Sequence, residues 1–248
     1  MSRIAILSAL AQEQHGLLAL LLQPQKVQRA GREFWLGDLH GHSVVLALSR
    51  IGKVAAATTA TALIEHLAVT RILFTGVAGG LAPDVQVGDV VVASSFVQHD
   101  LDASPIFPRF ELPLYGRAVL ACDEILSALL FQAARDHLAE ASAAAPARHR
   151  VHRGLIASGD RFVSAQAQSV ALRRALQRAG HEALAVEMEG AAVAQVCLDY
   201  GVPFAAVRTI SDRADDQAHL DFATFVREVA SQYACAIIGR ALRLLSNK

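Results

Sequence analysis

Acidic residues follow two apolar segments of this sequence, and their type and spacing make them the best candidates for chemistry. Glu187 and Glu189 stand two residues apart after the apolar run 183–186, and Asp212 follows the apolar run 202–210. A strand ending at the first run would aim both glutamates at one face, because side chains alternate along a strand. A carboxylate in apolar surroundings is costly unless it is paired or hydrogen-bonded. A solvated strand end would explain one such place, but two of them indicate a site at the carboxyl ends of strands in an open α/β sheet.

The composition is that of a compact globular protein. Of 248 residues, 53% are hydrophobic and 19% are charged, which excludes the disordered and fibrous classes. Lys and Arg together number 23, as do Asp and Glu, and no block of like charge occurs, so we expect no nucleic-acid partner. The N-terminal segment lacks the pattern of a signal peptide, and no apolar stretch reaches membrane-spanning length. We therefore expect a cytoplasmic protein that does not bind membranes.

The cysteines and histidines do not predict a metal site. The three cysteines are widely spaced in apolar surroundings, which favours reduced core thiols over a disulfide framework. The ten histidines include no HExxH or similar ligand spacing.

Strand and helix patterns alternate along the chain, which predicts a single three-layer α/β domain over residues 1–248. The predicted strands are 4–7, two or three within 23–49, then 71–75, 90–97, 151–158, 183–186 and 202–210. The predicted helices are 11–22, 54–67, 123–139, one that Ser164 caps and that runs to Gly180, one after Glu189, and 220–245. Glu13 lies in the first turn of the first helix, where the helix dipole favours a carboxylate.

Three connecting segments stand out. The Gly-rich segment 76–81 predicts a turn at which backbone can approach a ligand, although it lacks the G-x-G-x-x-G spacing of a dinucleotide site. Segment 98–117 holds three of the seven prolines together with Phe107 and Phe110, and we expect a lid or partner surface there rather than a loop that caps the core. Segment 140–147 predicts a mobile surface loop.

Four motifs at these strand ends, in this order and at these separations, resemble one known family. They are TGVAGGL at 75–81, SGDRFV at 158–163, VEMEGAAVA at 186–194 and RTISDRAD at 208–215. Together they are similar to the 5′-methylthioadenosine/S-adenosylhomocysteine nucleosidases of the purine and uridine phosphorylase superfamily. The resemblance implies a three-layer αβα sandwich on a mixed, twisted sheet, and usually a homodimer. It also implies hydrolysis of the N-glycosidic bond of 5′-thioadenosines to adenine and a 5-thioribose, without a cofactor.

The resemblance assigns the chemistry to a few positions. Asp212, beside Ser211, would hydrogen-bond or protonate N7 of adenine, which is a poor leaving group as an anion. We expect burial to raise the pKa of Asp212. Glu13, with Arg208 and Glu187, would hold and activate the water that captures the oxocarbenium-like sugar, whose charge nearby carboxylates stabilise.

The other matching positions would form the walls of the nucleoside site. Glu189 would bind the ribose hydroxyls, with Met188 packed on the sugar. Phe162 would stack on the purine, while the backbone of Val163 reads its Watson–Crick edge. Further expected lining residues are Leu10 and Ile51 on the ribose and thioalkyl side, Val77, Ala78 and Gly79 in the Gly-rich segment, Phe222 in the last helix, and Phe107 and Phe110, which would cover the 5′ substituent partly from a neighbouring subunit.

One departure from the superfamily pattern favours water over phosphate as the nucleophile. Phosphorolytic relatives place a hydroxyl residue just after the first glycine of the Gly-rich segment, an arginine a few residues before it, and another arginine after the first strand. This chain has Val77, Phe74 and the arginine-free run 11–28 at those places. A buried phosphate dianion would therefore have few partners, and burying it would be expensive.

Two alternatives remain open. One is a related purine nucleosidase or phosphorylase for another nucleoside, such as a futalosine-type substrate. The other is a nucleotide-binding module built around the Gly-rich segment, or a catalytically silent relative used in protein interactions. The joint presence of Glu13, Glu189, Arg208 and Asp212 speaks against this second alternative.

Overall fold

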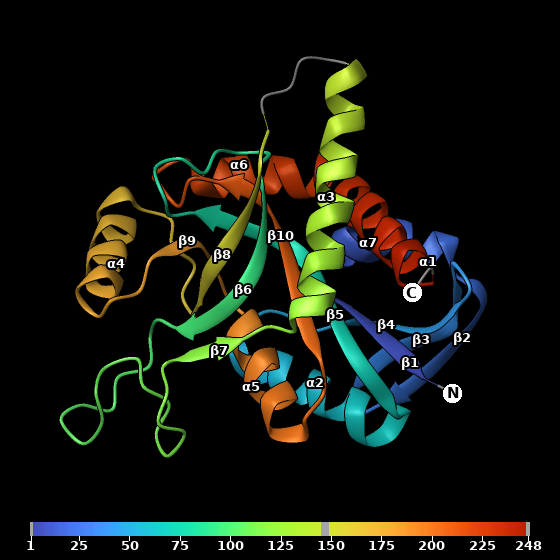
Figure 1. The fold of residues 1–248 in the computed structure, drawn as a ribbon, viewed down its shortest axis with the longest axis horizontal. Helices are drawn as coiled ribbons and strands as arrows, with labels where there is room; N and C mark the ends of the chain where they lie inside the picture. The colour runs from blue at the N-terminus through green and yellow to red at the C-terminus, as the bar shows by residue number, and fades with distance from the viewer. Residues whose placement is uncertain (1, 145–148, 247–248) are drawn as a thin grey trace.

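The computed structural model describes residues 2–144 and 149–246, in which a sheet lies between two layers of helices (Figure 1). In chain order the elements are β1 (Arg3–Ser8), α1 (Ala11–Leu20), β2 (Leu22–Arg29), β3 (Arg32–Leu39), β4 (His42–Leu48), α2 (Lys53–Leu67), β5 (Val69–Gly80), β6 (Val90–Gln98), β7 (Val119–Ala121), α3 (Glu124–Ala144), β8 (Val151–Ser158), α4 (Gln166–Arg178), β9 (Ala183–Glu187), α5 (Gly190–Tyr200), β10 (Phe204–Asp212), α6 (Ala218–Phe225), the π-helical turn η1 (Val226–Ala230) and α7 (Ser231–Ser246). The predicted mixed-sheet α/β fold is confirmed.

The strands form one mixed sheet, part of which closes on itself. Strand β10 pairs in parallel with β5 and antiparallel with β6. Strand β8 pairs in parallel with both β6 and β9, and β9 returns antiparallel to β5. These pairings complete a ring of β5, β10, β6, β8 and β9, from which β1, β4, β3 and β2 extend beyond β5. The closure brings the carboxyl ends of β5, β9 and β10 together, although these strands lie far apart in the sequence.

Two large apolar clusters fix the helix layers on the sheet. Helices α2 and α5 pack on one face through alanine, leucine and valine side chains. Helices α1, α3 and α7 pack on the other face, so the two layers lie on opposite sides of the sheet (Figure 1). Strand β10 is buried along all nine residues, since strands flank it on both edges and helices cover both of its faces. Among the described residues, no helix is long and apolar enough to cross a membrane.

The Gly-rich segment is not the predicted turn, because β5 continues as a strand to Gly80. Gly79 pairs with Val186 of β9 on one edge and with Asp212 of β10 on the other. Pairing on both edges holds this segment extended. Because its glycines have no side chains, both neighbouring strands can approach closely.

Three helix boundaries also differ from the predictions. Helix α3 continues through 140–144, where alanines favour helix and Glu140 forms an ion pair with Arg240 of α7. Residues 145–148 of the predicted loop lie outside the described residues. Helix α4 starts after Ala165 without a side-chain cap, so Ser164 is not the cap. The predicted closing helix is divided into α6 and α7 by the π-helical turn η1.

Candidate active site

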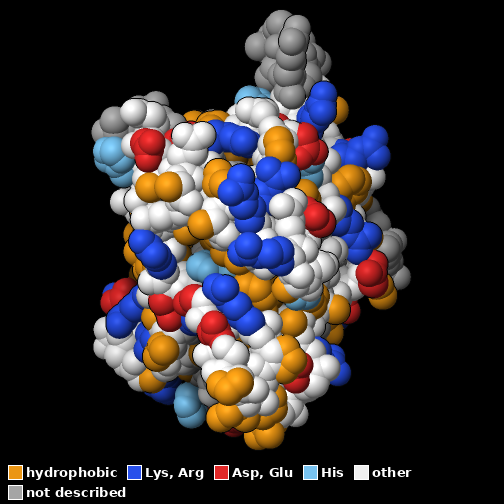
Figure 2. All heavy atoms as spheres, turned by 90° about the vertical axis from the view of Figure 1, so that its left-hand side faces the viewer, with side chains coloured by type: hydrophobic (Ala, Val, Ile, Leu, Met, Phe, Trp, Pro, Cys, Tyr) orange, Lys and Arg blue, Asp and Glu red, His pale blue; other side chains and the backbone are white. Residues whose placement is uncertain are grey.

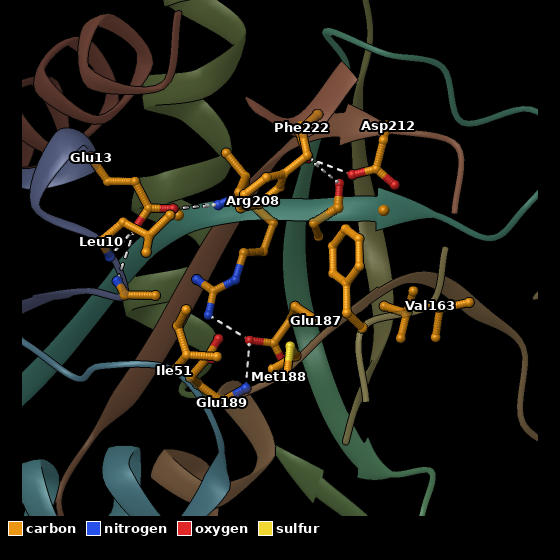
Figure 3. Close-up of a pocket in the computed structure, with 18 of the residues that line it drawn as sticks. Leu10, Glu13, Ile51, Val163, Glu187, Met188, Glu189, Arg208, Asp212 and Phe222 are labelled. Carbon is orange, nitrogen blue, oxygen red and sulfur yellow. Dashed lines mark hydrogen bonds and ion pairs between the residues drawn. The ribbon is translucent and has the colours of Figure 1, made fainter. Parts of the chain in front are cut away.

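A cavity of about 360 Å³ opens where the carboxyl ends of β5, β9 and β10 meet the start of α1. Its walls are mainly apolar, but carboxylates point into it from several elements (Figure 3). Its lining residues are Ala9, Leu10, Glu13, Ile51, Gly76, Val77, Ala78, Gly79, Arg161, Phe162, Val163, Val186, Glu187, Met188, Glu189, Arg208, Ser211, Asp212, His219 and Phe222. All of the predicted site residues except Phe107 and Phe110 are in this set.

Glu13 is both a helix-start acid and a cavity residue. It occupies the third position of α1, and its Oε2 accepts the backbone N–H groups of Ala9 and Leu10 at 2.8 and 2.9 Å. Its Oε1 accepts the N–H of Val77, 64 residues away on β5, at 3.1 Å. Burial raises the pKa of Glu13 above its usual range, against the lowering effect of these hydrogen bonds and of Arg208. The carboxyl group is therefore held in place and can accept a proton inside the cavity.

A buried ion pair joins β9 to β10. The Nη2 of Arg208 donates to Oε2 of Glu187 at 2.8 Å, and both side chains are almost fully buried. The Nη1 of Arg208 donates to the carbonyl oxygens of Phe74 and Val207, and its guanidinium group lies 4.1 Å from the centre of the Phe74 ring. Arg208 thus places one fixed positive charge among the carboxylates.

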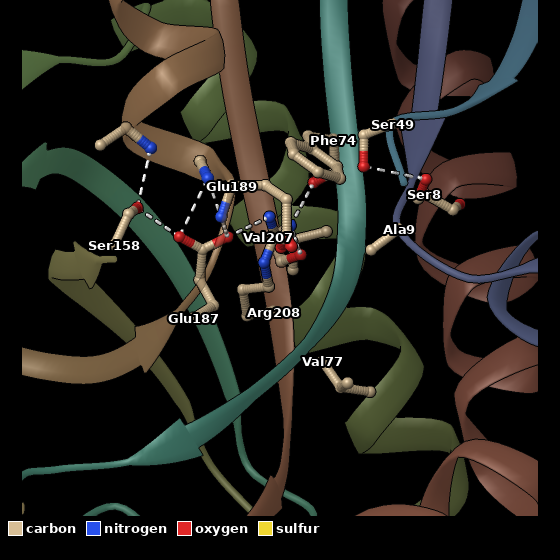
Figure 4. Close-up of polar contacts among 12 residues, drawn as sticks. Ser8, Ala9, Ser49, Phe74, Val77, Ser158, Glu187, Glu189, Val207 and Arg208 are labelled. Atoms are coloured by element: carbon tan, nitrogen blue, oxygen red, sulfur yellow. Dashed lines mark hydrogen bonds and ion pairs between the residues drawn. The ribbon is translucent and has the colours of Figure 1, made fainter. Parts of the chain in front are cut away.

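Glu187 is held by more than this ion pair (Figure 4). Its carboxylate accepts the N–H groups of Glu189 and Gly190 at the start of α5, where the helix dipole favours negative charge. The Ser158 hydroxyl also donates to Glu187, and it accepts the N–H of Ala191 at 2.8 Å. Both oxygens of Glu187 are engaged within the chain, so the residue orients Arg208 and α5.

Glu189 has a different environment, although it is only two residues away. It is the N-cap residue of α5, and its Oε1 accepts the N–H of Gly52 at 2.9 Å. Burial first, and then the neighbouring carboxylate of Glu187, raise the pKa of Glu189 to about 8. A protonated or partly protonated carboxyl at this place can both donate and accept hydrogen bonds with hydroxyl groups.

Asp212 ends β10 on the opposite side of the cavity from Glu13 (Figure 3). Its Oδ2 accepts the Ser211 hydroxyl and its Oδ1 accepts the N–H of Ala214, both at 2.8 Å. A Cβ added at Gly79 would come within 2.8 Å of Oδ1, so glycine is needed beneath this carboxyl group. Glu13 lies in the same way beside Gly76, three residues earlier on β5. At about 3.3 Å per residue the two acids are thus roughly 10 Å apart along the strand, which leaves room for a small molecule between them.

Aromatic and apolar side chains complete the walls. The rings of Phe162 and Phe222 pack edge to face at 5.6 Å, which joins the segment after β8 to α6. Phe162 is 40% exposed and Ile51 is 57% exposed, so these two residues lie toward the mouth of the cavity. Among the described residues, no group of three or more His, Cys, Asp or Glu could hold a metal ion.

The phosphorylase superfamily profile matches residues 3–243. The chain belongs to the phosphorylase superfamily. Among solved structures, it is similar to the S-adenosylhomocysteine nucleosidase of Streptococcus pyogenes in complex with 5-methylthiotubericidin, with 33% identity, a TM-score of 0.87, and coverage of 98% of this chain and 97% of that chain.

Two further solved structures of the superfamily cover nearly the whole chain. The 5′-methylthioadenosine/S-adenosylhomocysteine nucleosidase of Neisseria meningitidis, in complex with methylthio-immucillin-A, is 32% identical, with a TM-score of 0.88 and coverage of 98% and 100% of the two chains. The native futalosine hydrolase of Helicobacter pylori is 33% identical, with a TM-score of 0.85 and coverage of 96% and 97%. The resemblance inferred from the four motifs is confirmed.

Phe107 and Phe110 are the two predicted site residues outside the cavity. They belong to the segment between β6 and β7, which lies at the lower left of Figure 1. Phe110 is 1% exposed and packs in a small core cluster, with its ring edge to face against His181. Its expected place over a 5′ substituent is therefore corrected, because a buried ring offers no surface to a partner. Phe107 is half-buried, and its role at a partner's site stays a prediction.

Five lining residues were not among the predicted site residues: Ala9, Gly76, Arg161, Val186 and His219. Gly76, Arg161 and Val186 lie within the motifs that indicated the family, and Ala9 directly follows β1, so adjacency could have found them. His219 stands three residues before Phe222, which places both on one face of α6. Arg161 and His219 add positive charge or hydrogen-bond donors that a search for acids overlooks.

Proposed function

We propose that this protein is a hydrolase that cleaves the N-glycosidic bond of 5′-methylthioadenosine and S-adenosylhomocysteine, releasing adenine and the 5-thioribose product. The observation that carries the proposal is the set of buried carboxylates, from Glu13, Glu187, Glu189 and Asp212, around one apolar cavity. The nucleosidases among the similar solved structures support it.

In the proposed mechanism, the base leaves on the Asp212 side of the cavity. The Asp212 carboxyl shares its proton with N7 of adenine as the C–N bond breaks, so the purine does not depart as an anion. Phe162 packs on the purine. Glu189 binds the ribose hydroxyls from the start of α5, where it already accepts the Gly52 N–H. Positive charge that develops on the sugar is stabilised by the surrounding carboxylates.

The attacking water is placed on the Glu13 side. Glu13 accepts a proton from water there, and its raised pKa makes it a stronger base than an exposed glutamate. Arg208 holds Glu187 and keeps a fixed positive charge beside the water. Glu13 and Asp212 lie on opposite sides of the cavity (Figure 3). This arrangement allows the water to attack one face of the sugar while the base leaves from the other.

Water is a better nucleophile for this cavity than phosphate. Arg208 is bonded to Glu187, and Val77 presents an apolar side chain beside Glu13. A phosphate dianion near Glu13 would meet several carboxylates and no free buried cation among the described residues, which makes its binding unfavourable.

The experiment is adenine release from a panel of 5′-substituted adenosines in phosphate-free buffer. We expect release from 5′-methylthioadenosine and S-adenosylhomocysteine at a rate that added phosphate does not change. A rate that requires phosphate would support a phosphorylase instead. Absence of adenine release from every nucleoside, with the protein folded, would contradict the proposal.

A second candidate substrate is futalosine, because the futalosine hydrolase of Helicobacter pylori is as similar to this chain as the other nucleosidases are. Futalosine therefore belongs in the same panel. A much higher kcat/KM for futalosine than for either thioadenosine would select this second candidate.

We also propose that the protein is a homodimer and works in the cytoplasm. The support for the dimer is the exposure of large apolar side chains after β6, where Ile106 is 81% and Leu114 is 92% exposed. Light scattering of the purified protein tests it, and a monomer with full activity would contradict it. The cytoplasmic location stays a prediction from the sequence.

A further inference from the structure

The mouth of the cavity carries two side chains that the proposed hydrolysis does not use. Arg161 and His219 both line the cavity, and both are exposed. Within residues 2–144 and 149–246, neither the Arg161 guanidinium nor the His219 ring has a hydrogen bond or ion pair. Inside the cavity the Arg208 cation is paired with Glu187 among several carboxylates, whereas the donors of Arg161 and His219 at the mouth are unpaired among the described residues.

Packing and hydrogen bonds bring these two residues to the same edge. Arg161 directly precedes Phe162, and His219 lies one helical turn before Phe222. The edge-to-face contact of Phe162 with Phe222 therefore joins the two segments that carry Arg161 and His219, and both residues line the same cavity. A second link reinforces this, since Asp216, just before α6, accepts the N–H of Gln166 at the start of α4.

Other charged groups near this edge are already occupied. Lys53 donates to Asp100 at 2.6 Å and to Gln98 at 3.0 Å, and Asp160 accepts the backbone N–H of Lys53. The face of the molecule that carries α4 also gathers Lys and Arg side chains across its middle (Figure 2). A positive local field of this kind attracts anionic ligands.

We propose that Arg161 and His219 form an anion subsite that binds a carboxylate at the end of the 5′ substituent of the nucleoside. This inference rests on the proposed function, and it names the preferred substrates within it as 5′-thioadenosines with an acidic substituent, such as the homocysteine group. An arginine guanidinium presents paired N–H donors that match a carboxylate, and an imidazole N–H adds a further donor. The methylthio group offers nothing for these donors to bind.

The test compares three adenosines that differ only in the 5′ substituent: methylthio, 2-carboxyethylthio and 3-aminopropylthio. We expect wild-type kcat/KM to be highest for the carboxylate, and its advantage over the methylthio compound to shrink as salt screens the charges. An exposed ion pair contributes up to about 1 kcal/mol, so Arg161→Gln should lower the carboxylate-to-methylthio ratio by up to about fivefold. His219→Ala should lower the same ratio, and the double variant should lower it further.

Two more variants sharpen the result. Arg161→Glu should reverse the preference, so that the aminopropyl compound becomes better than the carboxyethyl compound. Arg174→Gln removes an exposed arginine from α4, outside the cavity lining, and is the matched control for a general loss of positive charge. It should leave the carboxylate-to-methylthio ratio as in the wild type.

The outcomes separate this inference from the function on which it rests. Adenine release from the methylthio compound, with a ratio that Arg161→Gln and Arg161→Glu leave unchanged, overturns the anion subsite and leaves the nucleosidase proposal standing. A wild-type preference for the aminopropyl compound also overturns the subsite. Wild-type protein that is folded but releases adenine from none of the three overturns both.

Discussion

Replacing Asp212 by asparagine tests whether one carboxyl group assists the departure of adenine. The change keeps the shape of the side chain and most of its bonding. The Asn oxygen can still accept the Ala214 N–H, which now meets Oδ1 at 2.8 Å. The Ser211 hydroxyl can turn from donating to Oδ2 to accepting from the new amide, because it also lies 3.4 Å from the Ala78 carbonyl. We therefore expect the variant to fold.

The expected loss of turnover follows from what asparagine cannot do. It can hydrogen-bond to N7, but it cannot transfer a proton as the glycosidic bond breaks. General-acid assistance contributes about 10²–10⁴ in rate, which corresponds to about 2.7–5.4 kcal/mol of transition-state stabilisation. Binding of an adenine analogue should change much less than turnover, since the Phe162 face and the Val163 backbone are untouched.

The assay is adenine release under saturating 5′-methylthioadenosine, with analogue affinity and the thermal unfolding midpoint measured in parallel. Asp215→Asn, the same chemical change three residues further along, is the control and should keep wild-type turnover. A folded Asp212→Asn variant with more than about a tenth of wild-type turnover would refute the reasoning, given the expected loss. Asp212 would then have a structural role, in which it accepts hydrogen bonds such as that of the Ala214 N–H at the end of β10.

Three further predictions concern the other acids and the glycine beneath Asp212. Glu13→Gln should lower mainly kcat, while Glu189→Gln should also raise KM because ribose contacts are lost, and identical kinetic profiles would contradict separate roles. The pKa of Glu189 is about 8 in the folded protein, so its carboxyl keeps a proton that it loses in the unfolded chain once the pH exceeds the ordinary glutamate pKa. The free energy of unfolding, measured by urea titration, should therefore fall in wild type relative to Glu189→Gln as the pH rises from 5 to 8. The expected fall is up to about 1.4 kcal/mol per pH unit. A difference between the two proteins that does not change with pH would show that the Glu189 carboxyl is not protonated. Gly79→Ala places a Cβ within 2.8 Å of Asp212 Oδ1 and should reduce turnover more than Ala82→Gly, which also changes one methyl group but lies two residues beyond the end of β5.

Much of the fold could be predicted from the pattern of apolar residues. Strands β6, β8 and β10 and helix α2 were expected close to their observed bounds, because long periodic segments have one favourable way to bury their apolar side chains. The Gly-rich end of β5 was expected to be a turn. Glycine has no side chain from which strand pairing could be recognised, and only the approach of β9 and β10 on both edges makes it a strand.

Part of the candidate site could also be predicted from the sequence. Acids that follow apolar runs placed Glu187, Glu189 and Asp212 together at strand ends, and Glu13 stood out at a helix start. Phe110 was expected at a ligand because the proline-rich segment around it shows no core periodicity. Its burial beside His181 depends on how that segment folds back on α4 and β9, which local sequence does not encode.

The sequence by itself determined which segments are buried and which of them end in acids, because burial of apolar side chains follows local periodicity. Only the tertiary structure decided how those acids differ. Glu187 accepts N–H groups from Arg208 and from the start of α5, so it is a fixed part of the framework. Glu189 forms no ion pair with any described residue, and burial raises its pKa to about 8. The physical reason is that desolvation and hydrogen bonding act over a few ångströms in space. The atoms that desolvate a carboxylate or donate to it come from positions far away in the chain, such as the Val77 N–H that donates to Glu13.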